Sequence, residues 1–426
     1  MSASDPSRYE EILIESSESR ESVDLRPGVQ SVDYYEDIFR PYVTAKILVT
    51  SSGPVINGRG IYQGLPLKGG ERVSLRIKQS VDGLPGLDFS QTPDDYLYVS
   101  GISNYISDST SETFILNLCS KVAITNETTR VTKRYPTSQN ISGSVEQIVK
   151  EYLNVPFAEA PHQTENKYGF IGNMRKPFTV IRWLASKGVD SETAGFVFYQ
   201  TKEGMHFKSL NKMIEQKPKA LYSETMVADG KGEQNEDFKI STYYLDKNQN
   251  VIEKLKLGAY SSMRYYFDFH RAAFTREQEG VYLHKDHIKK TNTLGSQDPG
   301  LPKVNSTDPK PLDEYPTRIM SGFIDRGTLE DKVDTTKNAD PFQYQSQALY
   351  RYADMFTQKV EMTVPMNTSL KAGDIIECDF RQTATGKEES DPIESGLYMI
   401  KQLRHHFDKE GSYTAMMLIR DTVGKR

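Results

Sequence analysis

Polar and apolar residues alternate with a period of two along much of the first 118 residues. The segment YVTAKILVTS at 42–51 shows the pattern, and RVSLRIKQS at 72–80 repeats it. Because successive side chains of a strand point to opposite faces of a sheet, both segments are predicted to be half-buried strands. The segment 96–120 predicts two more strands joined by a polar turn. The inward residues of these strands are expected to be Val43, Ala45, Ile47, Val49, Val73, Leu75, Ile77, Phe114, Leu116 and Leu118.

The spacing of apolar residues becomes helical near residue 140. In the segment 142–153 apolar residues recur every three or four positions, which is typical of a helix with one buried stripe. Ser144 and Gln147 match the capping box that begins many helices. We therefore expect a helix that begins near Ser144 and buries Val145, Ile148, Val149, Tyr152 and Leu153.

A second helix and a β-hairpin are predicted further along. Over 176–188, Pro177 suits the first helical position and Gly188 suits the left-handed residue that follows many helices. The segment 195–210 is predicted to form a hairpin that turns at Gly204. Its inward residues are expected to be Phe196, Phe198, Met205 and Phe207.

Strand patterns return between 236 and 270, and the composition then changes. Residues 289–340 are rich in Pro, Gly, Ser, Thr and Asp, which is typical of loops. A helix is predicted next, with Asp340 as its N-cap and its end near Lys359. The segments KVEMTVPM, GDIIECDF, GLYMIKQLRHHF and SYTAMMLIRD predict four strands that finish the chain.

These elements predict a mainly β fold with α+β parts, made of two antiparallel β-barrels, an inserted small α+β domain and a loop-rich insertion. A chain of 426 residues is long enough for two to four domains. The first barrel is assigned to residues 1–118 and the α+β domain to 119–222. The second barrel is assigned to 223–275 together with 341–426, and the loop-rich insertion to 276–340.

Charge and composition argue against several classes of protein. The net charge is −5 and no Lys/Arg-rich run is present, so sequence-specific nucleic-acid binding is not expected. The first residues lack the features of a secretory signal, and no apolar stretch approaches the length of a membrane span. We therefore expect synthesis in the cytoplasm and no membrane insertion. Cys119 and Cys378, the two cysteines, are expected to be buried thiols.

The adjacent residues His405 and His406 are the first candidates for metal or acid–base chemistry. Neighbouring side chains of a strand point to opposite faces, so the two rings are poorly placed to bind one metal ion. Strict alternation predicts one face with Leu397, Met399, Lys401, Leu403 and His405, and another with Tyr398, Ile400, Gln402, Arg404 and His406. Packing roles are therefore expected for both histidines.

The remaining candidates also have ordinary interpretations. His284 and His287 flank Asp286 at a spacing that suits a metal, but the polar, Lys-rich surroundings favour a solvated loop. Two carboxylate pairs could be the acid and base of a glycosidase, but carboxylates that flank turns on a solvated face are the ordinary explanation: Asp94 with Asp95, and Glu388 with Glu389. The sequence contains no nucleophile-elbow, P-loop or zinc-protease motif. We predict no catalytic, cofactor-binding or metal site, and no enzyme.

The order of the C-terminal segments resembles the C-terminal barrel of the central hub proteins of contractile bacteriophage tails. KVEMTV is followed by the turn SLKAGD, then by IIECDF, SGLYMIKQLRHHF, the turn DKEG and SYTAMMLIRD. In the middle of the chain, SVEQIVKEYLNVP, FTVIRWLASKG and GFVFYQTKEGMHFKSLNKMI are similar in order and spacing to the inserted domain of the T-even-type baseplate hub. The resemblance covers most of residues 35–420. Related barrels occur in the spike proteins of type VI secretion.

The resemblance implies a structural virion protein. Two tail-tube-like barrels per chain and three chains per ring would give the apparent six-fold symmetry needed to join a hexameric tail tube to a trimeric central spike. The implied partners are two further copies of the chain, the central spike protein, the tail tube or tube-initiator protein, the baseplate wedge proteins and the tape measure protein. DNA would pass through a neutral to acidic lumen without specific binding. The implied location is the tail baseplate of the virion, assembled in the host cytoplasm.

Two alternatives remain open. A hub of this kind can carry its own peptidoglycan-hydrolase activity, but residues 289–340 are too few and too polar to fold as such a domain. A hub of a type VI-like secretion spike would continue into a β-helical needle. Because the chain ends at IRDTVGKR after its last predicted strand, we expect any needle to be a separate polypeptide.

Overall fold

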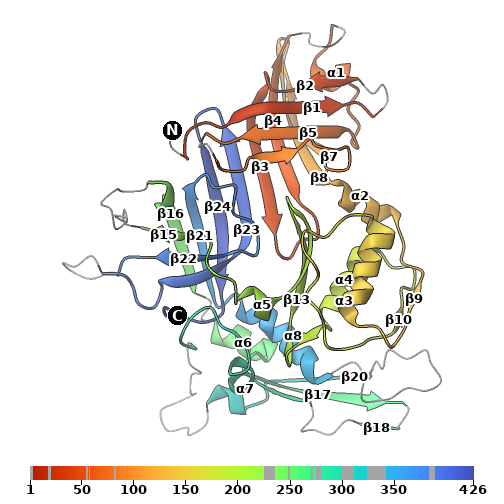
Figure 1. Ribbon diagram of the computed structural model, residues 1–426, viewed down its shortest axis with the longest axis vertical. Coiled ribbons are helices and arrows are strands. Elements are labelled where there is room, and N and C mark those ends of the chain that lie inside the picture. Colours follow the sequence, from red (N-terminus) through yellow and green to blue (C-terminus); the bar gives the residue numbers. More distant parts are fainter. Residues whose placement is uncertain are drawn as a thin grey trace.

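The computed structural model of the chain consists mainly of β-strands, with helices grouped around one half of the molecule (Figure 1). It describes residues 3–17, 21–53, 56, 58–80, 83–224, 236–247, 250–269, 272–274, 280–298, 311–323, 342–382 and 389–426. In the part of the chain so described, no helix is both long enough and apolar enough to cross a membrane.

Fourteen strands of the described chain form one large sheet. They are β1 (Arg8–Glu15), β2 (Ser22–Asp24), β3 (Val29–Asp37), β4 (Thr44–Ser52), β5 (Arg72–Lys78), β6 (Leu87–Phe89), β7 (Leu97–Ser107), β8 (Ser111–Ser120), β15 (Leu221–Ser223), β16 (Thr242–Lys247), β21 (Gln358–Pro365), β22 (Ile375–Asp379), β23 (Gly396–Asp408) and β24 (Ser412–Arg420). Hydrogen bonding follows the order β16-β21-β24-β23-β3-β4-β8-β7-β5-β1-β2. The pair of β15 and β22 is parallel, and the other pairs of this sheet are antiparallel.

Among the described residues, two of the apolar cores lie mainly on strands of this sheet. The first packs strands of the N-terminal part, and it contains all ten residues that alternation predicted to point inward. The second packs β21, β22, β23 and β24. Pairing of β3 with β23 joins the two parts, with Asp37 opposite Gln402 and Ser31 opposite Asp408. Strands from opposite ends of the sequence therefore lie side by side at the centre of the molecule (Figure 1).

A β-bulge in β23 changes which side chains share a face. Ile400 and Gln402 pair with consecutive residues of β24, so Lys401 is an extra residue on its strand. Because one extra residue moves all later side chains to the opposite face, Leu403 packs in the same core as Ile400. The prediction that Leu403 shares a face with Lys401 is wrong. Tyr398, Ile400 and Leu403 of β23 lie in this second core, whereas Phe407 further along the strand lies in the first core.

A middle unit of helices and a hairpin packs beside the large sheet (Figure 1). Its helices are α2 (Lys121–Thr128), α3 (Ile141–Ile148), the π-helix η1 (Val149–Leu153), α4 (Pro177–Ala185) and α5 (Leu210–Met213). Its strands are β9 (Arg134–Tyr135), β10 (Phe170–Ile171), β11 (Val189–Asp190), β12 (Thr193–Ala194), β13 (Phe196–Thr201) and β14 (Gly204–Ser209). The four predicted inward residues of the hairpin all lie in the core of this unit, which confirms its orientation.

The ends of two helices differ from the prediction. Helix α3 begins at Ile141, and Ser144 lies buried inside it, so the predicted capping box does not form. The hydroxyl of Thr164 accepts a hydrogen bond from the N–H of Ser142, at 2.9 Å, and thereby satisfies a helix-end group that a local cap usually serves. Pro177 does occupy the first position of α4. Gly188, however, is not left-handed.

A smaller sheet and three helices occupy the lower part of Figure 1. Its strands are β17 (Ser261–Asp268), β18 (Ala273–Phe274), β19 (Val281–Leu283) and β20 (Arg318–Phe323). The helices are α6 (Val251–Leu257), α7 (His284–Ile288) and α8 (Phe342–Asp354); the short turns α1 (Ile61–Gly64), η2 (Glu236–Phe238) and η4 (Leu312–Glu314) complete the described elements. The predicted strand near residues 263–268 is present as β17, which belongs to this separate sheet.

The predicted helix before the last strands ends earlier than expected. Helix α8 ends at Asp354, and Lys359 already lies in β21, because that segment pairs with β24 and β16. Asp340, the predicted N-cap, lies outside the described residues. The mainly β fold class with α+β parts is confirmed. The division into four sequence ranges stays a prediction.

Candidate functional site

His405 lies in the buried interior between the two halves of the large sheet. Its ring is fully buried, stacks on the ring of Tyr34 at 6.2 Å between centroids, and has Nδ1 3.0 Å from the hydroxyl of Thr414. Burial lowers the pKa of His405 to about 3, so the ring is neutral at physiological pH. These contacts support the packing role predicted for His405.

His406 contacts different partners on the opposite side of the strand. Its Nδ1 lies 2.6 Å from Asp33 of β3, and its Nε2 lies 2.9 Å from Asp408. The hydrogen bond to Asp33 is the main reason why the pKa of His406 is raised. Arg404 also donates to Asp33, at 2.7 Å. The His406 cluster therefore ties β23 to β3, the strand pair that joins the two halves of the chain.

The prediction of a solvated loop for His284 and His287 is wrong, since both histidines are buried in the short helix α7. His284 lies between Asp298 and Asp354, at 3.6 and 3.5 Å from their carboxylate oxygens. Burial opposes the charge of His284, but the two carboxylates outweigh it and raise the pKa to about 10. His287 shows the opposite shift. Burial, together with the charge of Arg351, lowers the pKa of His287 to about 4.

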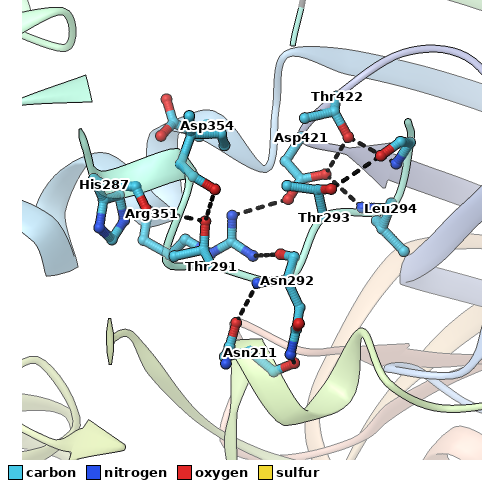
Figure 2. A network of polar contacts seen from close by, with 12 residues as sticks. Asn211, His287, Thr291, Asn292, Thr293, Leu294, Arg351, Asp354, Asp421 and Thr422 are labelled. Atoms are coloured by element: carbon cyan, nitrogen blue, oxygen red, sulfur yellow. Dashed lines mark hydrogen bonds and ion pairs between the residues drawn. The ribbon is translucent and has the colours of Figure 1, made fainter. Parts of the chain in front are cut away.

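A buried ion pair lies next to these histidines. Arg351 of α8 and Asp421, which follows β24, approach to 2.8 Å, and their side chains are only 1% and 0% exposed. The second amino group of Arg351 donates to the carbonyl of Asn292 at 2.8 Å. Asp421 also accepts from the N–H of Leu294, at 2.9 Å. Figure 2 shows how the arginine reaches between the loop and the C-terminal segment.

Further hydrogen bonds extend this network in both directions. The N–H of Asn292 donates to the side chain of Asn211 at 2.6 Å, which fixes the loop to α5. Thr422 accepts from the N–H of Gly295 at 2.7 Å. Polar contacts to three segments that are distant in sequence therefore hold the loop 291–295, and Leu294 anchors it in an apolar core (Figure 2).

Glu36 of β3 is a second buried charged group at a junction. Its carboxylate accepts hydrogen bonds from the Tyr34 hydroxyl at 2.9 Å, from the N–H of Lys202 at 2.8 Å and from the N–H of Ala372 at 2.9 Å. The partners belong to β3, to the turn of the β13–β14 hairpin and to the loop before β22. Burial raises the pKa of Glu36 to about 7. The carboxylate thus joins three parts of the fold.

The carboxylate pairs of the sequence lie in exposed positions where they are described. Asp94 forms an exposed ion pair with Lys121, and Asp95 accepts hydrogen bonds from Thr92 in the same turn. Glu389 is exposed, and Glu388 lies outside the described residues. The two cysteines are free and buried, as predicted. Among the residues that the structure describes, no group of three potential ligands is arranged to hold a metal ion.

Sequence reasoning missed Arg351, Asp421 and Glu36. Arg351 stands in the polar helix α8, Asp421 follows the last strand, and Glu36 stands in an alternating strand beside other acidic residues, so no local signal distinguishes them. Buried charges are rarely kept without a partner, so each predicts a partner elsewhere in the chain. The partners themselves come from segments far away in sequence. Arg351, Asp421 and Glu36 can fix these segments relative to one another, because their side chains are hydrogen-bonded to other parts of the protein.

No protein-family model and no curated protein sequence matches the chain. Solved structures do match. A 43 kDa tail protein of prophage MuSo2 from Shewanella oneidensis aligns with a TM-score of 0.52 over 97% of this chain and 98% of that chain, at 9% identity. A tail protein from Neisseria meningitidis MC58 aligns with a TM-score of 0.50 over 96% of each chain, at 8% identity. The chain has the fold of these tail proteins. A component of the type VI secretion system from Escherichia coli aligns with a TM-score of 0.44 over 94% of this chain and 76% of that chain, at 8% identity.

Proposed function

We propose that the chain is a structural protein of a bacteriophage tail, and that it works as a baseplate hub. The observation that carries the proposal is the alignment with a prophage tail protein over nearly the whole length of both chains. The order of strand and helix segments in the sequence, which resembles contractile-tail hubs, supports the finer assignment. In this proposal the hub is a homotrimer that joins the hexameric tail tube to the trimeric central spike.

The arrangement of the large sheet supports this symmetry argument. One chain carries two β-rich parts with separate cores, and the pairing of β3 with β23 holds them side by side. Three chains related by a three-fold axis would therefore present six β-rich parts in a ring, which matches a six-fold tube on one side and a three-fold spike on the other. The proposed partners are the spike, the tube or tube-initiator protein, the wedge proteins and the tape measure protein, in the tail baseplate of the virion.

We also propose that the chain has no enzymatic activity. Most of the described candidate groups support this, because Asp94 is in an exposed ion pair, Asp95 is bonded within its own turn, and His284, His405 and His406 contact neighbouring side chains. The DNA and the tape measure protein would pass through the ring, and a neutral to acidic lumen would keep phosphates from binding. A continuous Lys/Arg-lined lumen in the assembled ring would contradict this part of the proposal.

The oligomeric state tests the hub assignment. We expect native mass spectrometry of the purified chain at micromolar concentration to show a trimer, and electron microscopy to show a ring with a central channel. Each interface should bury well above roughly 1,200 Å², as specific complexes do. The presence of monomers alone at micromolar concentration would contradict the trimer. Incubation with purified peptidoglycan tests the enzymatic alternative, and release of soluble fragments would favour a hub with its own hydrolase activity.

A further inference from the structure

The sequence segment that contains α4 differs in charge from the rest of this acidic chain. The segment 166–189, which includes α4, contains five basic residues and no acidic residue, whereas the whole chain has a net charge of −5. The basic residues are Lys167, Arg175, Lys176, Arg182 and Lys187. Trp183, the single tryptophan of the chain, lies on the same helix and is 38% exposed.

Exposed apolar side chains accompany these charges. Met174, in the turn that leads into α4, is 64% exposed, and Ile171, at the end of β10, is 49% exposed. Large apolar side chains at the surface are expected where a partner covers them, especially when polar residues surround the patch. Lys187 lies 5.3 Å from the centroid of the Trp183 ring, so charge and aromatic surface are in direct contact here.

The surface around α4 contains three neighbouring hollows. Their volumes are about 540, 920 and 360 Å³. Arg182 lines the first two hollows and Thr179 lines the second and third, so the hollows follow one another around the helix. Aromatic and aliphatic side chains make up much of their walls: Phe39, Tyr352 and Phe356 in the first, Tyr42, Ile124 and Phe178 in the second, and Ile171, Val180 and Trp183 in the third.

Two arginines at these hollows are available for a partner. Arg40 lines the second hollow and Arg182 separates the first from the second; both are exposed. Within the described part of the chain, neither forms an ion pair with a carboxylate. Lys176, in contrast, is already paired with Glu127 across the second hollow. Arginine is well suited to bind carboxylates because its donors match both oxygens at once.

The turn before α4 is held in one conformation. Asn173 and Met174 are both left-handed, with φ angles of 48° and 56°, which is uncommon for residues other than glycine. The N–H of Met174 donates to the carbonyl of Val131 at 3.0 Å, and the N–H of Val131 donates to the carbonyl of Arg175 at 2.9 Å. The exposed side chain of Met174 is therefore presented by a fixed backbone, which reduces the entropy lost on binding.

We propose that the α4 surface, defined by Arg40, Met174, Thr179, Arg182 and Trp183, binds an acidic peptide segment of another protein through alternating carboxylate and apolar side chains. The carboxylates of the peptide pair with Arg40 and Arg182, and the apolar side chains of the peptide enter the hollows on either side of α4. Charge complementarity selects this occupant, because the carboxylates of an acidic segment are attracted to the two exposed arginines at the hollows. The inference stands independently of the proposed role in a tail.

Other anionic ligands fit this surface less well. A nucleic acid is bound chiefly by clustered basic side chains along its phosphates, whereas here exposed Met174, Ile171 and Trp183 lie among the charges. A membrane surface favours a continuous amphipathic face, whereas three hollows interrupt the surface around α4. A peptide offers both kinds of group at the spacing of neighbouring side chains.

The single tryptophan makes the test specific. The probe is a synthetic twelve-residue peptide with the repeat Glu-Leu-Asp-Phe, and the matched probe replaces every acidic residue with lysine. We expect the acidic peptide to change Trp183 emission in a saturable way, with an affinity that falls as salt is raised, and the lysine peptide to give no saturable change. R182E should weaken binding of the acidic peptide about tenfold or more. M174N, which suits the left-handed backbone, should weaken it severalfold.

A matched control separates this surface from general charge effects. Arg8 is an exposed arginine at the start of β1, and R8E changes the net charge by the same amount as R182E. We expect R8E to bind the acidic peptide like the unchanged chain. Equal binding of both peptides, or equal affinities for R182E and R8E, would overturn the proposal. It would also be overturned if phosphatidylglycerol vesicles or a DNA duplex changed Trp183 emission while the acidic peptide did not.

Discussion

The buried pair of Arg351 and Asp421 gives a sharp test of how the loop 291–295 is held. In R351M the carboxylate of Asp421 stays buried without its cation, and the carbonyl of Asn292 loses its donor. Removing one partner of a buried ion pair destabilises proteins by about 3–5 kcal/mol, because the remaining charge is left uncompensated. We expect the free energy needed to open the structure around the loop to fall by this amount. The residual hydrogen bond from Leu294 to Asp421 limits the loss to the lower part of that range.

Hydrogen–deuterium exchange is the appropriate measurement, because a chain with several cores need not unfold in one step. A loss of about 3–5 kcal/mol corresponds to roughly a hundredfold to several-thousandfold faster exchange of the protected amides in 291–298 and 412–422. The control is R26M, which removes an arginine from the exposed pair with Asp24. We expect R26M to leave exchange unchanged, because exposed pairs contribute little.

Two further variants decide the cause of the effect. D421N keeps the oxygen that accepts from Leu294 and removes the charge, so the double variant R351M/D421N should recover part of the loss, with a coupling free energy of about 0.5–3 kcal/mol. Exchange in R351M no faster than in R26M would refute the reasoning that the buried pair holds the loop.

Three other predictions follow from buried groups. I400D should destabilise the chain by several kcal/mol, because it places a carboxylate in the second core, and I400L should destabilise it much less. Thermal unfolding measures both effects. An unchanged unfolding midpoint for I400D would contradict the buried position of Ile400. The pKa of Glu36 is raised to about 7 in the folded chain, so the stability contributed by its protonated form is present in full below the unfolded pKa of about 4.3 and is lost as pH rises through 7. In urea titrations at several pH values, E36Q should therefore show a smaller decrease of unfolding free energy with pH than the unchanged chain. An equal decrease in both proteins would argue against the raised pKa. Burial raises the pKa of the thiols of Cys119 and Cys378, so a thiol reagent at pH 7 should label them only after denaturation, and rapid labelling of the folded chain would contradict their burial.

Regular local patterns allowed much of the fold to be predicted from the sequence. Ten inward residues of the N-terminal strands and four of the hairpin lie in the predicted cores, because alternation reports directly on which face of a strand is buried. The stripe of the helix at 142–153 is likewise correct. What failed were features set by distant partners. The start of α3 depends on Thr164, and the bulge at Lys401 depends on the pairing of β23 with β24, neither of which has a local signal.

The buried charged groups could not be predicted from the sequence for the same reason. His284 reads as part of a polar stretch until Asp298 and Asp354 are brought beside it. Glu36 resembles any polar residue of an alternating strand, and its donors lie in the segments around Lys202 and Ala372. A sequence without an alignment contains no information on which of its many charged residues will meet. The burial of a charge and the identity of its partner therefore have to be found in the structure.

The pairing of β3 with β23 has a consequence for how the chain is made. A ribosome releases β3 long before it has synthesised β23, so one edge of the N-terminal sheet stays unpaired while most of the chain is translated. Exposed strand edges invite pairing with other chains, and contacts between distant residues form slowly. The middle unit, whose helices and hairpin lie within 121–213, has its own core and can fold during this interval. Nascent chains on polysomes therefore carry an open sheet edge, and it closes only when the last strands emerge.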